Sequence, residues 1–224
     1  GWGLRSQKRW AAAYEGGKYK VGEEIMALEI PQRKGDPIMF DRYEPPRKTT
    51  LEKLAKLRTI YGSPTVTAGN APGMNAGGSA IVIMSRKKAD KLGLQPLATI
   101  ETMAWDAAEP KYMATLPAKS INKALSSTQK SIEDLDLIEI NEAFAAVALV
   151  SLKVLADMDA HKYNALQEIT NINGGAIAIG HPVGASGARI AMTLMYELMR
   201  RGGGCGVAAI CGGLGQGESI ILQV

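Results

Sequence analysis

Histidine and cysteine are scarce in this sequence, which has two of each among its 224 residues. The histidines are His161 and His181, and the cysteines are Cys205 and Cys211. No set of metal ligands surrounds the cysteines, so we expect no metal site. Both cysteines are predicted to be free thiols in a reducing, cytoplasmic compartment.

Long apolar runs are missing as well. The longest, at residues 143–152, is interrupted by Ser151 and is too short to span a bilayer, so we expect a buried helix there and no membrane partner. The first residues, Gly-Trp-Gly-Leu-Arg, lack the apolar core of a signal peptide. The chain does not begin with methionine, as is typical of a processed or truncated protein.

Motifs for nucleotide phosphates are absent too. No G-x-G-x-x-G follows a predicted strand, and no phosphate loop with its lysine is present, which argues against dinucleotide and P-loop functions. The formal net charge of +4 is spread along the chain, which fits a small polyanion as well as nucleic acid and is typical of ordinary solvated surface. We therefore expect no nucleic acid partner.

The pattern of apolar residues changes near residue 75. Before it, the chain is irregular and contains the pair Pro45 and Pro46; after it, predicted strands and helices alternate, which indicates an α/β fold. The helix after residue 143 is apolar on nearly every face and should be buried between layers. The predicted strands are 24–31, 80–84, 97–105, 135–140, 206–210 and 219–224, and the predicted helices are 6–14, 51–57, 87–92, 120–128, 143–156 and 188–200.

Three polar residues occupy equivalent places in this pattern. Asn141 follows a predicted strand, His181 lies in the glycine-rich loop 171–187 before a helix, and Cys211 follows another strand. Because side chains at the ends of strands converge on one edge of an α/β sheet, we expect them to share a site. For Asn141 the alternative is a helix N-cap, whereas His161 lies in a polar stretch and is expected to be exposed.

Glycines follow Cys211 at four of the next six positions, including Gly213. Their backbone N–H groups could stabilise an oxyanion and, with a nearby histidine, lower the pKa of the thiol below about 8.5. Cys211 is therefore a candidate nucleophile or general acid/base. The alternative is a small buried thiol in a tight turn, and Cys205 is assigned to that structural class.

Four segments resemble motifs of the thiolases, the family that includes acetyl-CoA acetyltransferases. N-I-N-G-G-A-I-A-I-G-H-P-V-G-A-S-G at 171–187 is similar to the family's histidine motif, and N-E-A-F at 141–144 to its asparagine motif. C-G-G-L-G-Q-G at 211–217 resembles its C-terminal cysteine motif, and T-A-G-N-A-P-G-M-N at 67–75 its pantetheine-contacting loop. The resemblance covers nearly the whole chain.

The resemblance implies a layered α/β/α C-terminal domain at residues 75–224 and part of an irregular, CoA-contacting loop domain at residues 1–74. It also implies a Claisen condensation of an acyl-CoA with acetyl-CoA, or the thiolytic cleavage of a 3-ketoacyl-CoA. Acyl-CoA and CoA would be the substrates, and no further cofactor is expected. The family's habit suggests a homo- or hetero-oligomer, a dimer or tetramer.

The resemblance also implies roles for four residues. Cys211 would remove the α-proton from the attacking acetyl-CoA, while His181 and a water held by Asn141 hydrogen-bond the thioester oxygen. His181 would help to activate the acylated cysteine, and the N–H of Gly213 would contribute to a second oxyanion hole. Fixed donors aimed at a developing oxyanion are the largest catalytic contribution in such chemistry.

Ten further positions are expected from the resemblance to contact the substrate or CoA. Met113 resembles a methionine in the acyl pocket of short-chain enzymes, and Pro72 replaces a serine that binds pantetheine in many members. Three basic residues lie where the loop domain meets the CoA phosphates. The ten are Ala68, Ala71, Pro72, Met74, Met113, Ala143, Phe144, Arg47, Lys48 and Arg58.

One departure from the family pattern concerns the nucleophile. Thiolases form their acyl-enzyme on another cysteine, followed closely by a serine, and both cysteines here lie after residue 200. We therefore expect that a second chain carries the N-terminal half, or that this sequence is a fragment of a longer thiolase. Two alternatives stay open: a non-catalytic CoA-ester-binding or assembly subunit, and a stand-alone cysteine hydrolase that uses Cys211 and His181.

Overall fold

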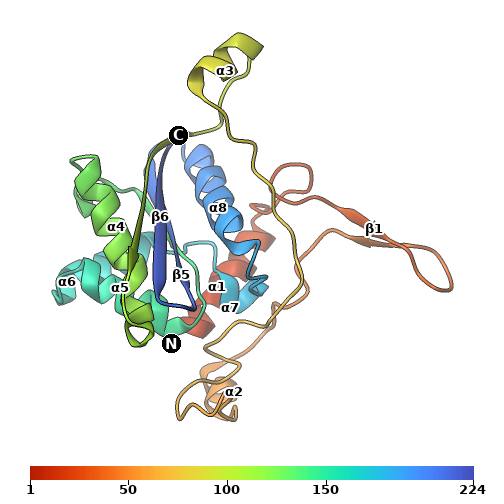
Figure 1. Ribbon diagram of the computed structural model, residues 1–224. Coiled ribbons are helices and arrows are strands. Elements are labelled where there is room, and N and C mark those ends of the chain that lie inside the picture. Colours follow the sequence, from red (N-terminus) through yellow and green to blue (C-terminus); the bar gives the residue numbers. More distant parts are fainter.

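A four-stranded sheet lies at the centre of the structure, a computed structural model that describes all residues from 1 to 224 (Figure 1). Its strands lie in the order β3-β6-β5-β4. β4 and β5 are parallel, whereas β6 is antiparallel to both of its neighbours. The strands are β3 (Thr99–Ala107), β4 (Leu137–Ile140), β5 (Cys205–Gly212) and β6 (Gln216–Gln223).

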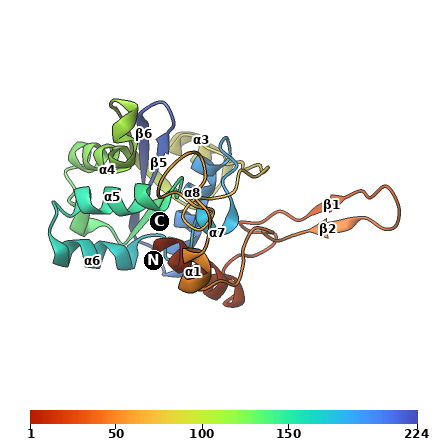
Figure 2. The ribbon, with the colours of Figure 1, turned by 90° about the horizontal axis from the view of Figure 1, so that it is seen from below.

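Helices cover both faces of this sheet (Figures 1 and 2). Because successive side chains of a strand point to opposite faces, Val207 of β5 joins one hydrophobic cluster and Ala208 the other. The predicted layered α/β fold is confirmed. On one face lie α4 (Leu116–Ser127), α5 (Ala145–Leu155) and α6 (Ala160–Ile169); on the other lies α8 (Ser186–Arg200), and α1 (Trp2–Glu15) packs against α7 (Ala176–Ile179).

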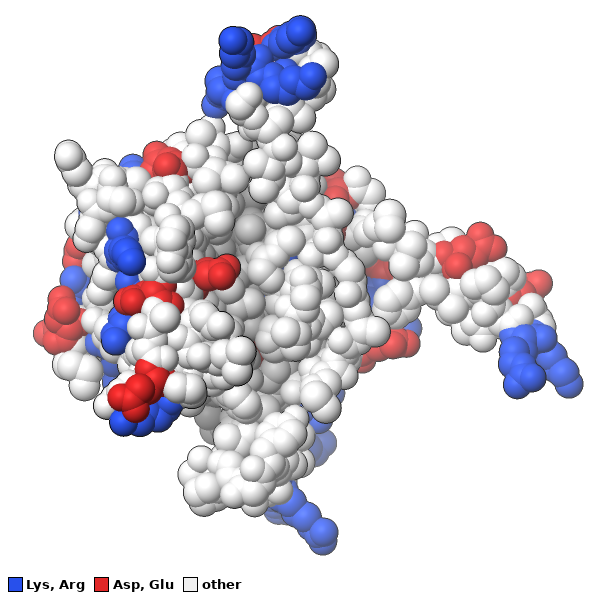
Figure 3. All heavy atoms as spheres, viewed as in Figure 1, with Lys and Arg blue, Asp and Glu red and all other residues white.

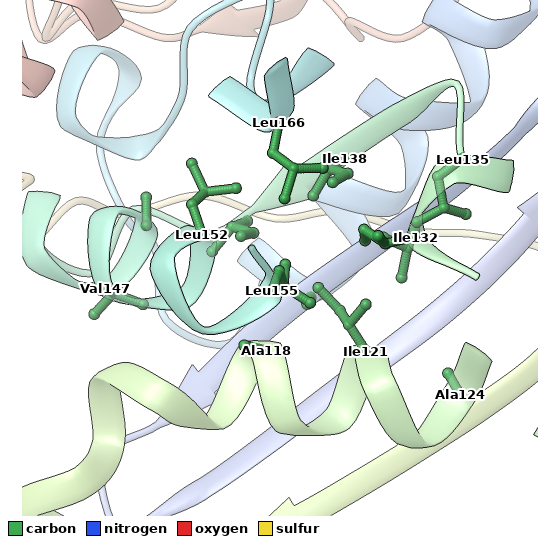
Figure 4. Packing of buried hydrophobic residues seen from close by; sticks show 14 of the residues in the cluster. Ala118, Ile121, Ala124, Ile132, Leu135, Ile138, Val147, Leu152, Leu155 and Leu166 are labelled. Atoms are coloured by element: carbon green, nitrogen blue, oxygen red, sulfur yellow. The ribbon is translucent and has the colours of Figure 1, made fainter. Parts of the chain in front are cut away.

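The apolar helix α5 lies between α4 and α6, as Figure 4 shows. Leu152 and Leu155 of α5 belong to the same buried cluster as Ile121 of α4 and Leu166 of α6. A helix that is apolar on most faces is stable only when neighbours cover those faces. The prediction of a buried helix after residue 143 is thus confirmed.

The sheet and the helices that cover it form the body of the structure. Several short elements lie outside this body, along a long and mostly extended stretch of chain. A β-hairpin projects from the body and α3 lies apart from it (Figure 1). None of the helices is long and apolar enough to cross a membrane. The outlying elements are β1 (Leu28–Ile30), β2 (Ile38–Phe40), α2 (Leu51–Ala55) and α3 (Arg86–Leu92), and the 3₁₀ helices are η1 (Pro110–Thr115) and η2 (Ile132–Asp134).

Several predicted elements differ from the structure. The predicted strand at residues 80–84 is wrong: the segment pairs with no other strand, and Val82 is 85% exposed. Its residues favour a strand, but strand formation also needs a neighbouring strand, and this chain places none there. The strand predicted at 24–31 shrinks to β1, and α6 and α7 were not predicted.

Candidate active site

Asn141 and His181 meet at the carboxyl end of β4. Asn141 directly follows this strand, and its backbone N–H donates to the carbonyl of Ala209 on β5 at 2.9 Å. Its side chain is completely buried, and Nδ2 lies 3.3 Å from Nε2 of His181. The structure thus brings together two of the residues that the sequence placed at one edge of the sheet.

The alternative role of Asn141 as a helix cap is wrong. Helix α5 begins four residues later at Ala145, and Phe144 occupies its N-cap position without a side-chain capping bond. The carboxamide of Asn141 is instead held by two side chains, because Oδ1 accepts a hydrogen bond from Arg189 at 3.3 Å and Nδ2 contacts His181. This leaves its orientation defined from both ends.

Hydrogen bonds to Ser186 define the tautomer of His181. The Ser186 hydroxyl donates its single proton to the carbonyl of Pro182 at 3.0 Å, and its Oγ lies 2.6 Å from Nδ1 of His181. With its proton on the Pro182 carbonyl, Oγ accepts from a protonated Nδ1, an arrangement that leaves a lone pair on Nε2 facing the Asn141 amide. Burial, and then the positive charge of Arg189, lower the pKa of His181, so the imidazole is neutral at pH 7.

Cys211 lies near the end of β5, the strand that pairs with β4. It is 9% exposed and belongs to the larger hydrophobic cluster. The expectation that glycine N–H groups and a histidine lower its pKa is not met: burial raises the pKa of the thiol, and only its own backbone N–H acts to lower it. Its sulfur makes no hydrogen bond to His181.

The turn after Cys211 exposes a free backbone donor. Gly213 is exposed, and its N–H donates to no acceptor within the chain, whereas the N–H of Gly215 closes the turn on the carbonyl of Gly212 at 3.2 Å. A free N–H at the edge of a site is the kind of group that can stabilise an oxyanion. This geometry is consistent with the predicted role of Gly213.

The loop at residues 67–75 packs against the histidine loop. The backbone N–H of His181 donates to the carbonyl of Gly73 at 3.1 Å. Gly180 has a φ of +95°, and a Cβ there would lie 2.3 Å from Oδ1 of Asn75, so only glycine fits. In this loop Ala71 is buried, whereas Met74 is 88% exposed. The predicted pantetheine loop therefore borders His181.

The remaining predicted contact residues fall in two places. Met113, Ala143 and Phe144 pack against the cluster that contains Cys211. The guanidinium of Arg47 donates to the carbonyl of Ala68, so this basic residue contacts the loop at residues 67–75.

The three basic residues lie outside the hydrogen bonds of the Asn141–His181 pair. Arg47 and Lys48 line a cavity of about 320 Å³ beside α1. Arg58 is exposed beyond α2, and Pro72 is half-buried in its loop. None of the three basic side chains hydrogen-bonds to Asn141, His181 or Cys211.

Glu142 is a buried residue that the sequence analysis did not single out. Its carboxylate accepts hydrogen bonds from Nε1 of Trp2 at 2.8 Å and Oγ of Ser6 at 2.6 Å, both on α1. It also accepts from the backbone of Ile177 at 3.0 Å and from Asn171 at 3.3 Å, both in the histidine segment. Glu142 thereby joins α1 to the segment that carries His181.

Ser186 and Arg189 were missed as well. They lie five and eight residues after His181, and their spacing of three places them on one face of a helix. The predicted helix began only at residue 188, so this shared face was not apparent. No group of three or more His, Cys, Asp and Glu side chains is placed to hold a metal ion.

Two family models together match nearly the whole chain. Residues 94–224 match the family model described as thiolase, C-terminal domain, and residues 1–87 match the model described as thiolase, N-terminal domain. The chain belongs to the thiolase family. The resemblance drawn from the four sequence motifs is confirmed.

Individual relatives cover this thiolase chain almost completely, but the chain covers only part of them. An acetyl-CoA acetyltransferase of Chromobacterium violaceum is 46% identical over 222 residues, which make up 98% of this chain and 54% of that protein. The crystal structure of the Bacillus anthracis acetyl-CoA acetyltransferase superimposes with a TM-score of 0.90 and 40% identity, covering 99% of this chain and 54% of that one.

A human structure is similar too. Human mitochondrial 3-ketoacyl-CoA thiolase in complex with CoA gives a TM-score of 0.83 and 38% identity, covering 99% of this chain and 53% of that one. The thiolase chain thus spans about half the length of these relatives.

Proposed function

We propose that this thiolase chain supplies the acid/base half of an acyltransferase site. The reaction would be the Claisen condensation of an acyl-CoA with acetyl-CoA, or the thiolytic cleavage of a 3-ketoacyl-CoA. A second polypeptide with the N-terminal half would supply the nucleophilic cysteine. CoA thioesters would be the only small molecules needed, and the complex would act in cytoplasmic fatty acid metabolism or β-oxidation as a homo- or hetero-oligomer.

The contact between Asn141 and His181 carries this proposal. The pair lies at the end of β4, next to the end of β5 where Cys211 is located, and beside the loop at residues 67–75. Polar side chains at the carboxyl ends of adjacent parallel strands are the usual setting of an α/β active site. Relatives at 44–46% identity are acetyl-CoA acetyltransferases.

His181 is prepared to act first as a base. With a proton on Nδ1 and a lone pair on Nε2, the neutral imidazole can accept the proton of an incoming thiol, which would replace the Asn141 N–H at that lone pair. The protonated Nε2 can then donate a hydrogen bond to a thioester oxygen as negative charge develops there. Asn141 Nδ2 is a second donor at the same place.

The raised pKa of Cys211 suits proton transfer to and from carbon. At neutral pH the side chain is a thiol and can protonate the enolate that leaves in thiolysis. In the condensation direction, its thiolate would be a stronger base than an ordinary cysteine and could remove the weakly acidic α-proton. A raised pKa also disfavours the alternative of a stand-alone cysteine hydrolase, which needs a thiolate at neutral pH.

Reconstitution with a relative's N-terminal half tests the proposal. The chain is mixed with the part of the Chromobacterium violaceum protein that precedes the matched region, and the thiolysis of acetoacetyl-CoA is followed. We expect activity from the mixture and none from either part. Cys211→Ala and His181→Asn should abolish it, whereas Cys205→Ala should retain it. If the two active-site variants have no effect, the chain is instead a non-catalytic CoA-ester-binding or assembly subunit.

A further inference from the structure

Arg189 is the one charged side chain in contact with the Asn141–His181 pair. It lies in the first turn of α8 and is half-buried. Its guanidinium makes one hydrogen bond, to Oδ1 of Asn141 at 3.3 Å, and no carboxylate lies within 4.0 Å of it. A partly buried cation is normally paired with an acid, so a neutral amide as its single acceptor is unusual.

The basic residues near the far end of α8 show the contrast. Lys18, Arg200 and Arg201 all bind the carboxylate of Glu197 at 2.9 to 3.2 Å. In that cluster each of the three cations has a carboxylate partner near the end of the helix. Arg189 has no such partner, and its one acceptor is the Asn141 carboxamide.

Two acids interact electrostatically with Arg189, Glu139 on β4 and Glu24, and burial raises the pKa of both. Glu139 is buried, and its Oε2 has no hydrogen-bond partner. Burial raises the pKa of Glu139 to about 8, even though the charge of Arg189 acts to lower it. The carboxyl of Glu139 is therefore mostly protonated at pH 7, and Glu24, with a pKa of about 7, is only partly ionised, so the positive charge of Arg189 is incompletely balanced.

We propose that Arg189 is a positioning residue that fixes the Asn141 carboxamide, so that Nδ2 faces Nε2 of His181. After burial, its positive charge is the second factor that lowers the pKa of the imidazole. The guanidinium has only donors, so it must bind Oδ1 and thereby turns Nδ2 towards His181. Ser186, one helical turn earlier, holds the other ring nitrogen. The first turn of α8 thus orients both polar side chains. The link to catalysis rests on the proposed function, but the positioning itself does not.

The hydrogen bonds form one directed chain. Arg189 donates to Asn141, Asn141 to Nε2 of His181, Nδ1 of His181 to Ser186, and Ser186 to the carbonyl of Pro182. Arg189 has only donors, so the Asn141 oxygen faces Arg189 and its N–H₂ faces His181; a proton on Nε2 would then meet another donor. The chain therefore requires the neutral, Nδ1-protonated imidazole.

Two NMR measurements on the chain itself test this role without any enzyme assay. First, long-range ¹H–¹⁵N spectra of the wild-type protein at neutral pH report which imidazole nitrogen carries the proton. We expect Nδ1–H on His181. A proton on Nε2 would overturn the proposal.

Second, the Hε1 signal of His181 is titrated in Arg189→Gln and Arg189→Lys. Loss of the cation should raise the titration midpoint of His181 in Arg189→Gln, whereas Arg189→Lys, which keeps the charge, should stay close to the wild type. His161 provides the internal reference signal, and Arg201→Gln is the matched control at the other end of α8. An unchanged midpoint in folded Arg189→Gln, or an equal rise in Arg201→Gln, contradicts the proposal.

The reconstituted assay then connects positioning to catalysis. With the N-terminal half present, Arg189→Lys should lower kcat for acetoacetyl-CoA thiolysis on the order of 100-fold through misplacement of the Asn141 amide. If the NMR results hold and no mixture is active, the proposed function fails and the positioning role stands. If the wild-type mixture is active and the NMR results do not hold, the positioning role fails alone.

Discussion

At the scale of single residues, burial rather than neighbouring glycines controls the chemistry of the two cysteines. Burial raises the pKa of both Cys205 and Cys211. We therefore expect iodoacetamide to modify the folded chain at pH 7 at least about tenfold more slowly than the urea-unfolded chain, because only the thiolate reacts. The rate should rise steeply as the pH exceeds 9. Fast labelling of Cys211 at pH 7 in the folded chain would contradict this explanation.

Glu142 carries a second prediction at this scale. All four groups that contact its carboxylate are donors, and the amide of Glu142→Gln would turn one N–H₂ towards another donor. We expect the free energy of unfolding in urea to fall by about 1–3 kcal/mol or more. The matched control, Glu15→Gln at the exposed end of α1, should change it by less than about 0.5 kcal/mol. Equal effects in the two variants would show that Glu142 is not the link between α1 and the histidine segment.

At the scale of elements, β4 carries a carboxyl group into the interior and so makes stability depend on pH. The pKa of Glu139 is raised by burial to about 8 in the folded chain, above its usual 4.5. A raised pKa means that stability is fully present below pH 4.5 and is lost as the pH rises through 8. Relative to Glu139→Gln, the wild type should thus lose stability across this window, as measured by urea unfolding at several pH values. A constant difference between the two proteins would show that Glu139 does not titrate in the folded state.

The turn between β5 and β6 depends on one glycine. Gly215 has a φ of +86°, and a Cβ there would lie 2.2 Å from the carbonyl oxygen of Ala108. Gly215→Ala should therefore lower the free energy of unfolding by more than about 1 kcal/mol. Gly213→Ala, in the same turn, has open space for a Cβ and keeps its backbone N–H, so it should leave stability nearly unchanged. The reverse order of the two effects would contradict the geometry of the turn.

Elements whose contacts are local or strongly patterned could be predicted from the sequence. Helices α5 and α8 and strands β4 and β5 follow from apolar residues at helical or strand spacing, and they also place Asn141 and Cys211 at one edge. The contacts of Glu142 and Arg189 could not be predicted. Glu142 lies 136 residues from its partner Ser6, and Arg189 lies 48 residues from its partner Asn141. Such contacts depend on how the layers pack, which periodicity does not encode.

At the scale of the whole molecule, charge and apolar surface are unevenly distributed. In Figure 3, Lys and Arg side chains gather on α3 and at the tip of the hairpin, whereas the face between them is largely uncharged. The unpaired segment at residues 80–84 has exposed apolar side chains, among them Val82 at 85% and Ile83 at 67%. Exposed apolar segments whose backbone is not paired are typical of surfaces that bind another chain. This segment lies within the region matching the thiolase N-terminal domain.

A substitution in that segment should weaken association with the N-terminal half and leave folding unchanged. Val82→Asp should leave the thermal stability of the chain almost unchanged, because the side chain is already in solvent. It should weaken binding of the N-terminal half, as measured by calorimetry, because a charge would be placed at an apolar interface. Met158→Asp, at an exposed position in the turn between α5 and α6, is the control and should bind normally. Normal binding by Val82→Asp would exclude this segment from the interface.

The same segment shows why one prediction from the sequence is wrong. Residues 80–84 have the composition of a strand, and the prediction fails because a strand needs a partner that this chain does not provide. The four motifs, in contrast, identified the family correctly, because each motif is a run of neighbouring residues that can be recognised without knowing how the chain packs.

The location of the acyl-enzyme tests the central claim most directly. The chain, alone and with the N-terminal half, is treated with acetoacetyl-CoA, quenched in acid and examined by peptide mass spectrometry. We predict no acetyl group on the chain alone and, in the mixture, an acetyl group on a cysteine of the N-terminal half but none on Cys211. Acetylation of Cys211, or turnover by the chain alone, would contradict a site in which this chain supplies the acid and base and another supplies the nucleophile.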